Sequence, residues 1–218
     1  MIKAVIFDFD GLLVDTEIIS YRIYKTILET YSHSFSMEEY ARNYSGKTEK
    51  ENIRNLIDTY RLPLSFDECF SLEQETEKEL FEKGVELKPG VLKLLRHLNE
   101  KKYKIAIATS SDRERAMKIL KKHCLHSYFM AGVFAEDISH CKPDPEIFLK
   151  AAEKLNEDPR CCLVLEDSEA GILAAFNAGM KTVCIPDMKK PDNVYLDKCL
   201  AAKDTLDEVI SVLNDHLL

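Results

Sequence analysis

Several features that would point to other classes of protein are missing from this sequence of 218 residues. It has no apolar run near the roughly 18 residues that suggest a membrane-spanning helix. It also has no Lys/Arg cluster long enough for a nucleic-acid footprint, and its formal net charge of −8 does not favour phosphate-rich polymers as partners. No internal repeat or low-complexity tract is found. We therefore expect neither a membrane nor a nucleic acid as a partner.

The seven cysteines give no disulfide or metal-binding pattern. Their number is odd and no C-x-x-C pair occurs. Met1 leads almost directly into an apolar run, so we expect no secretory leader. These observations predict reduced thiols and a cytoplasmic location. The hydrophobic content of 45% and charged content of 31% are those of a globular protein, either one large domain or a domain with an insertion.

The most informative stretch is residues 3–17. Ala4 to Phe7 is a short apolar run, typical of a strand buried on both faces, and it ends at Asp8. Asp10 and Gly11 follow. Two carboxylates this close repel each other unless a cation neutralises them, and Mg²⁺ prefers oxygen ligands. Taken alone, the same residues could simply form a polar turn.

Beyond this stretch, residues 16–83 show helical spacing of apolar residues and no convincing strand, with Thr16 as a candidate N-cap. From residue 84 onward, helices and strands alternate, which predicts a parallel, doubly wound α/β sheet that includes the first strand. The strands expected after the first cover residues 103–108, 129–135, 161–165 and 181–185. We predict a polar loop over 187–193 and a final helix over 205–217.

This pattern predicts two domains. Residues 1–15 and 84–218 form an α/β core with a Rossmann-like sheet, and residues 16–83 form an inserted all-helical cap. Because the insertion follows the carboxyl end of a strand, it is expected to act as a lid over an active site.

Polar residues recur where the predicted strands end. Thr109 and Ser110 follow the second strand, and Glu166 and Asp167 follow a later one. Lys142 lies in a proline-flanked loop. Individually, Thr109 could be a helix N-cap, Lys142 a solvated lysine, and the acidic pair a favourable helix start. Their convergence at one edge of a sheet is harder to explain by structure alone.

Such a set of residues suits phosphoryl transfer. A carboxylate can accept the phosphoryl group as an aspartyl-phosphate, while Mg²⁺ neutralises the developing charge. A hydroxyl and the backbone N–H groups at a helix start bind phosphate oxygens, and a lysine supplies a positive charge. A second acid can protonate the leaving oxygen and then activate water.

Four segments together resemble the haloacid dehalogenase-like (HAD) phosphohydrolase superfamily. They are the segments 8–17 (DFDGLLVDTE), 109–110 (TS), 142–145 (KPDP) and 165–171 (LEDSEAG). They occur in the order of that family's four motifs, and the resemblance spans essentially the whole chain. The helical insertion after the first motif resembles the cap of the β-phosphoglucomutase-like subgroup.

The resemblance implies a role for each residue of these motifs. It implies that Asp8 is the nucleophile and a metal ligand, and that Asp10 is the general acid/base and a metal ligand through its backbone carbonyl. Lys142 would be catalytic and would bind the phosphoryl group, as Thr109 would, with Ser110 beside Thr109. Asp167 would coordinate Mg²⁺, with Glu166 either a ligand or an acid behind it. The dehalogenases of the superfamily lack the second aspartate, so Asp10 argues against dehalogenation.

Within the subgroup, the sequence favours a phosphatase over a sugar phosphomutase. The mutases carry a histidine on the first cap helix, whereas Ser20 stands at the corresponding position here and no histidine occurs between residues 11 and 32. Gly46 and Lys47 resemble the substrate-specificity loop of the cap, although Gly46 could equally be a turn before a helix.

The predicted function is therefore Mg²⁺-dependent hydrolysis of a small phosphorylated metabolite, a sugar or nucleoside phosphate, by a monomer. A β-phosphoglucomutase-like mutase is the alternative. A phosphorylated receiver module, which shares the aspartate, hydroxyl and lysine, is a third possibility, but residues 16–83 have no place in such a module.

Overall fold

The computed structural model describes residues 1–215. The chain divides into two compact units. The first, an α/β unit, combines residues 1–14 with the chain from residue 87 onward, and the second, a helical unit, is Asp15–Glu86. The two connections between the units run side by side, because the N–H of Asp15 donates to the carbonyl of Glu86 at 2.9 Å and Val14 bridges to Leu87.

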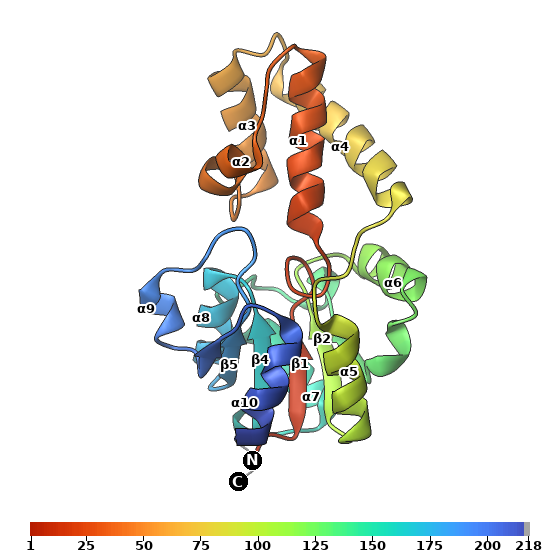
Figure 1. The fold of residues 1–218 in the computed structure, drawn as a ribbon, viewed down its shortest axis with the longest axis vertical. Coiled ribbons are helices and arrows are strands. Elements are labelled where there is room, and N and C mark those ends of the chain that lie inside the picture. The colour runs from red at the N-terminus through yellow and green to blue at the C-terminus, as the bar shows by residue number, and fades with distance from the viewer. Residues whose placement is uncertain (216–218) are drawn as a thin grey trace. The chain divides into compact units, whose positions relative to one another are not determined.

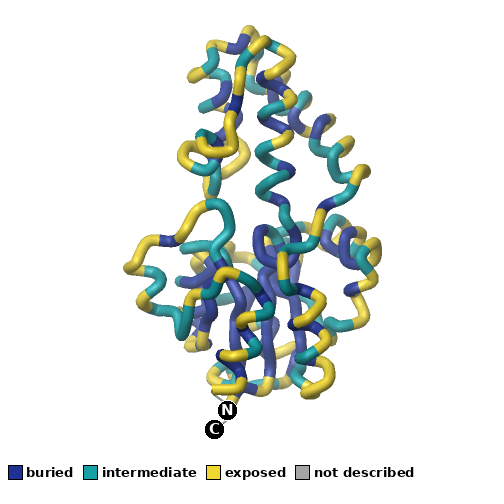
Figure 2. Tube along the Cα trace, in the orientation of Figure 1, coloured by how far each residue is buried: buried dark blue, intermediate teal, exposed yellow. Residues whose placement is uncertain are grey.

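The α/β unit is built on one parallel sheet of six strands in the order β3-β2-β1-β4-β5-β6 (Figure 1). The strands are β1 (Ala4–Phe7), β2 (Lys104–Ala108), β3 (Ala131–Val133), β4 (Cys162–Glu166), β5 (Lys181–Cys184) and β6 (Ala201–Ala202). In the central strand β1, all four residues are buried, as expected for a strand covered on both faces. Figure 2 shows the same burial along the middle of the sheet.

Strand register explains why the polar residues after the strands lie at one edge. Phe7 of β1 is paired with Ile107 of β2 on one side and with Leu165 of β4 on the other. The next residues along the three strands are therefore level with one another. Asp8 and Glu166 consequently lie at the same carboxyl edge of the sheet, where open α/β sheets bind their ligands.

Helices cover both faces of this sheet. Contacts join α7 to β1, β2 and β3 and α8 to β4 and β5, whereas α5 contacts β2 and α10 (Figure 1). The helices of this unit are α5 (Val91–Glu100), α6 (Arg113–Lys122), α7 (Glu146–Leu155), α8 (Glu169–Asn177), α9 (Asn193–Leu196) and α10 (Val209–Asp215). Short 3-10 turns lie at His126–Tyr128, Ala135–Asp137, Pro159–Cys161 and Leu206–Glu208.

The helical unit contains α1 (Thr16–Thr30), α2 (Met37–Asn43), α3 (Glu49–Tyr60) and α4 (Phe66–Lys83). Its core is aromatic: the rings of Tyr24, Phe35, Tyr40 and Tyr44 lie within 6.4 Å of one another in successive pairs. Capping boxes start two of the helices, at Thr48 for α3 and Ser65 for α4. This unit therefore has the buried core and the helix caps of a self-contained bundle.

The predicted fold class is confirmed, and the structure corrects several local predictions. The strand expected over 129–135 is shortened to β3, because residues 135–137 form a 3-10 turn. The final helix expected over 205–217 begins only at Val209, after another 3-10 turn, and residues 216 and 217 lie outside the described residues. Asp15, rather than Thr16, precedes the first turn of α1.

One strand and one α-helix of the described residues were not predicted. Strand β6 is only two residues long and pairs with β5 through Ala201 and Ala202, so it leaves no apolar run to recognise. Helix α9 is four residues long, less than the two turns over which helical spacing becomes visible. In the described part of the chain, no helix is long and apolar enough to cross a bilayer.

Candidate active site

Asp8 lies at the end of β1, and its side chain is nearly buried. Its backbone N–H continues the sheet by donating to the carbonyl of Leu165 at 3.0 Å. The chain then turns at Gly11, which has a φ of +77°. A Cβ at Gly11 would lie 2.5 Å from Oδ2 of Asp167 and 3.1 Å from Oδ2 of Asp187. Gly11 is therefore required both for the turn and for the close approach of two carboxylates.

Lys142 links the two strand ends on either side of it. Its Nζ forms ion pairs with Oδ1 of Asp8 and, at 2.5 Å, with Oε1 of Glu166. The three side chains are 10%, 9% and 0% exposed, so the contact is shielded from water. The same ammonium group lies 5.1 Å from the ring centroid of Phe148. Charge-assisted bonds in such a place are strong and orient their partners.

Glu166 is held on both oxygens by protein groups. Besides the Lys142 bond to Oε1, its Oε2 accepts bonds at 3.0 Å from the N–H of Asp167 and from the N–H and hydroxyl of Ser168. Ser168 is the N-cap of α8, so these donors belong to a helix start. Gly171 makes room for the group, because a Cβ there would collide with the Glu166 carboxylate.

The carboxyl groups of this cluster outnumber its one lysine, and the pKa values of its members shift accordingly. Burial raises the pKa of Asp8 to about 7, a shift that Lys142 opposes and Glu166 reinforces. Burial also raises the pKa of Asp167 well above its usual range, and the charges of Glu166 and Asp8 act in the same direction. Burial by itself would lower the pKa of Lys142, but Asp8 and Glu166 raise it above its usual value.

A divalent cation fits this arrangement. The raised pKa values mean that protons would otherwise have to neutralise the carboxylates, and a cation can take over that role. The oxygens of Asp8 and Asp167 are hard ligands of the kind that Mg²⁺ prefers. Glu166 is less suited, because its oxygens already accept four protein hydrogen bonds.

Asp10 is held by the segment that follows β2. Its Oδ1 forms an ion pair at 2.9 Å with Nη1 of Arg115, and its Oδ2 accepts a hydrogen bond at 2.5 Å from the hydroxyl of Ser111. Thr109, which is 1% exposed, places its hydroxyl 3.5 Å from the same Oδ2 and accepts a bond from the Ser111 N–H at 3.0 Å. Thr109 and Asp10, proposed from separate motifs, are thus neighbours.

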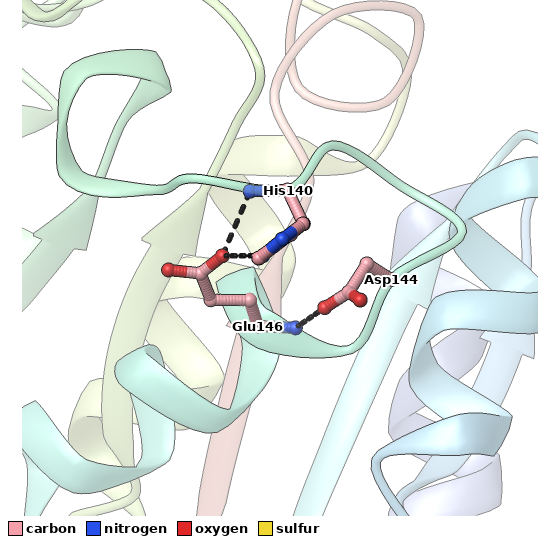
Figure 3. Close-up of side chains that lie close together, drawn as sticks. All are labelled: His140, Asp144 and Glu146. Atoms are coloured by element: carbon pink, nitrogen blue, oxygen red, sulfur yellow. Dashed lines mark hydrogen bonds and ion pairs between the residues drawn. The ribbon is translucent and has the colours of Figure 1, made fainter.

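The loop that carries Lys142 is braced by its own side chains (Figure 3). Oε2 of Glu146 accepts from the backbone N–H groups of Ser139 and His140 and lies 3.1 Å from Nδ1 of His140. Oδ1 of Asp144 accepts from the N–H of Glu146 at 2.9 Å. An ion pair with Lys150 is the main reason why the pKa of Glu146 falls to about 2. These contacts fix the loop and so the direction of the lysine.

The remaining predicted site residues have fewer contacts. Ser110 is exposed at the end of β2, beside Thr109. Gly46 and Lys47 are exposed in the helical unit, between α2 and α3. Gly46 has a φ of +76°, and the N–H of Lys47 donates to the carbonyl of Tyr44 at 3.2 Å, so this segment is a tight turn.

Four residues of this region were not predicted from the sequence: Lys88, Ser111, Arg115 and Asp187. Lys88 and Asp187 form an ion pair of 2.6 Å whose side chains are 15% and 7% exposed. Asp187 follows β5 closely, so it carries the same signal as the other acidic residues after strands and could have been found. Arg115 lies within a helix rich in charged residues, and nothing in its local sequence distinguishes it.

Comparison with known proteins identifies the class that this fold and this site define. Residues 5–185 match the haloacid dehalogenase-like hydrolase family. The chain is 34% identical over 216 residues to a phosphorylated carbohydrates phosphatase of Thermotoga maritima, covering 99% of this chain and 100% of that one. It is 33% identical to a β-phosphoglucomutase of Bacillus subtilis, covering 98% and 95%.

A solved structure supports membership of the same family. A conserved haloacid dehalogenase-like protein of unknown function from Agrobacterium tumefaciens superposes with a TM-score of 0.85 at 26% identity, and 100% of each chain is covered. The chain therefore belongs to the haloacid dehalogenase-like hydrolases, and it is an enzyme. The prediction of that family is confirmed.

Proposed function

We propose that the protein is a Mg²⁺-dependent phosphatase that hydrolyses a small phosphorylated metabolite through an aspartyl-phosphate on Asp8. The observation that carries this proposal is the buried contact of Lys142 with Asp8 and Glu166 at the carboxyl edge of the sheet. A carboxylate held there beside a fixed lysine is oriented for attack, and a phosphoryl group is the anion that this charge pattern accommodates once a cation is bound.

In the first half of the reaction, a carboxylate oxygen of Asp8 attacks phosphorus and the bond to the leaving oxygen breaks. Asp10 donates a proton to that oxygen, so the alcohol departs neutral. In the second half, Asp10 takes a proton from a water molecule that attacks the phosphorus. The bond between phosphorus and Asp8 then breaks, which releases inorganic phosphate and restores the Asp8 carboxylate and the protonated Asp10.

Other residues of the site bind and neutralise the phosphoryl group. The Lys142 ammonium and the Thr109 hydroxyl bind its oxygens, with Ser110 adjoining Thr109. Asp8, Asp167 and the backbone carbonyl of Asp10 would hold Mg²⁺, which supplies positive charge against the phosphoryl oxygens. We assign Glu166 to holding Lys142 rather than to the metal, because both of its oxygens are already bonded.

The substrate is proposed to be a sugar or nucleoside phosphate. This choice is supported by the name of the Thermotoga maritima relative, a phosphatase of phosphorylated carbohydrates. We propose that residues 16–83 act as a cap on the core of residues 1–15 and 84–218, and that Gly46 and Lys47 contribute to substrate selection. Lys47 is exposed and positively charged, so it can meet a second anionic or hydroxyl-rich group of the substrate.

A sugar phosphomutase is the second candidate, and the similarity to the Bacillus subtilis β-phosphoglucomutase favours it. Against it stands Ser20, at the position where the mutases carry a histidine. Its hydroxyl donates to the carbonyl of Thr16 one turn earlier in α1, at 3.4 Å. A serine used in this way cannot exchange protons as an imidazole does.

The test is phosphate release from a panel of phosphorylated metabolites, with isomerisation of a hexose 1-phosphate assayed alongside in the presence of a hexose bisphosphate. We expect phosphate release that needs Mg²⁺, stops with EDTA and is lost in Asp8→Asn. The surface variant Asp158→Asn is the matched control, since the Asp158 side chain is 42% exposed and pairs with its sequence neighbour Arg160. Isomer formation without phosphate release would establish the mutase instead.

Binding of Mg²⁺ has a readout that does not depend on activity. A ligand that binds the folded protein raises the free energy of unfolding, by about 2.7 kcal/mol when the ligand concentration is a hundred times Kd. The melting temperature rises as a result. We expect Mg²⁺ to stabilise the wild type and to have little effect on Asp167→Asn. Equal stabilisation of both proteins would contradict this assignment of the metal ligands.

A further inference from the structure

The contact between Arg115 and Asp10 is not explained by the fold alone. Arg115 is the third residue of α6, and its side chain reaches back to the N-terminal end of that helix, the direction in which helical side chains lean. There its guanidinium meets Oδ1 of Asp10 at 2.9 Å, and the same Nη1 also donates to the hydroxyl of Ser111. Because Ser111 bonds Oδ2, the segment 111–115 holds both oxygens of Asp10.

Helix α6 has other anchors and does not need this contact to stay in place. The Asp112 side chain caps it by accepting from the N–H of Arg115 at 2.8 Å, and its residues Ala116 and Leu120 are buried in the core. Arg113 ties the start of the helix to Asp137 at 2.9 Å and to the ring of Phe134. Helix α6 is therefore anchored by residues other than Arg115.

The geometry points to Arg115 as a positioning residue for Asp10. With Ser111 it holds the carboxylate in one orientation toward the leaving oxygen of the substrate. The planar, permanently charged guanidinium suits this task better than a lysine. When it is protonated, a carboxyl group keeps one O–H donor beside its acceptor positions, so the contacts of Asp10 with Arg115, Ser111 and Thr109 leave its proton for the leaving oxygen. This inference rests on the proposed function, in which Asp10 protonates the leaving oxygen.

Orientation of a proton donor matters most when the leaving group is poor. The test therefore compares phenyl phosphate with p-nitrophenyl phosphate, which are similar in shape. Phenyl phosphate releases phenolate, which is much more basic than the p-nitrophenolate released by the other substrate. The measured quantity is kcat/KM, because it reports the steps up to transfer of the phosphoryl group to Asp8 and is not affected by later hydrolysis of the aspartyl-phosphate.

For Arg115→Met we expect kcat/KM for phenyl phosphate to fall about 30-fold or more, a part of the roughly 10²–10⁴-fold that general acid catalysis contributes. The value for p-nitrophenyl phosphate should fall about threefold or less, since its leaving group needs little protonation. Arg115→Lys should recover part of the loss, and Ser111→Ala should show a smaller loss with the same selectivity. Arg113→Met, on the same helix, is the matched control and should affect both substrates equally.

The outcomes separate this inference from the proposed function. Equal losses for the two substrates in Arg115→Met, or no loss in either, would overturn the positioning role. If Arg115→Met does not fold, as judged by its melting temperature, Ser111→Ala decides by the same comparison. Full activity in Asp8→Asn would instead refute the proposed function itself, whatever the Arg115 variants do.

Discussion

Lys142 is the residue on which the charge balance of the active site depends. It neutralises Asp8 and Glu166 in a place that water hardly reaches. Removing one partner of a buried ion pair leaves the others unpaired, and this is far more costly than the net contribution of the pair to stability. The residue should therefore matter for the fold as well as for the proposed reaction.

We predict that Lys142→Met lowers the free energy of unfolding by about 3 kcal/mol and the phosphatase rate by about a hundredfold or more. Urea unfolding at pH 7 and phosphate release measure the two effects. Lys154→Met is the control, because Lys154 is 41% exposed and pairs with Asp137 at the surface. A Lys142→Met protein as stable as this control would show that the carboxylates do not need the lysine.

Gly171 offers a second test at the scale of a single residue. It lies inside α8, where alanine would normally stabilise a helix by about 0.5–1 kcal/mol. A Cβ at this position would collide with the Glu166 carboxylate, which four hydrogen bonds hold in place. We therefore predict that alanine at position 171 destabilises the protein.

Gly171→Ala should lower the free energy of unfolding by about 1 kcal/mol or more, as overpacked sites do, and should reduce activity by displacing Lys142. Thermal unfolding and steady-state kinetics measure both. A gain in stability with unchanged activity would mean that Glu166 moves aside freely and does not orient the lysine.

At the scale of elements, helix α4 carries a buried acid that the proposed reaction does not use. Glu73 is 5% exposed, and burial together with Glu49 of α3 and Glu77 of its own helix raises its pKa to about 8. Gln74 bridges Glu73 and Glu49 with bonds of 2.9 and 2.6 Å. In α1, Tyr24 also faces this group. Glu73 is therefore protonated in the folded helical unit at neutral pH.

This makes the stability of the helical unit depend on pH. Between about 4.5 and about 8, the folded protein holds a proton that the unfolded chain has lost, so stability falls as pH rises through this range. At about 1.4 kcal/mol for each unit of pKa shift, we predict a loss of up to about 5 kcal/mol over this range. Glu73→Gln should flatten this dependence, measured by urea unfolding at pH 5, 7 and 9, whereas the exposed Glu75→Gln should retain it. Identical slopes in all three proteins would contradict the prediction.

For the whole molecule, the division into two units has a consequence for folding. The connections at residues 14–15 and 86–87 lie side by side, so the helical unit can be removed without pulling the α/β unit apart. The α/β unit keeps its own core, which includes Ile6, Ala108 and Val164. We predict that replacing residues 15–86 by a short Gly/Ser linker leaves a cooperatively unfolding protein.

Circular dichroism and thermal unfolding of that shortened chain test the prediction. A separate chain of residues 15–86 should also be helical and should show a cooperative transition, because its aromatic core is complete within these residues. A shortened chain that lacks a thermal transition would show that the two units depend on each other for folding.

The sequence by itself determined the sheet and most of the polar residues at its edge. Short β-branched runs that end in acidic or hydroxyl residues are local signals, and parallel pairing then brings Asp8, Thr109 and Glu166 to one edge. Short elements such as β6 were missed, because two residues carry too little pattern. The tertiary structure alone decided that Arg115 reaches Asp10 and that Lys142 joins Asp8 to Glu166. Those contacts join residues up to 134 positions apart, and their direction depends on helix starts and loops whose geometry no local pattern encodes.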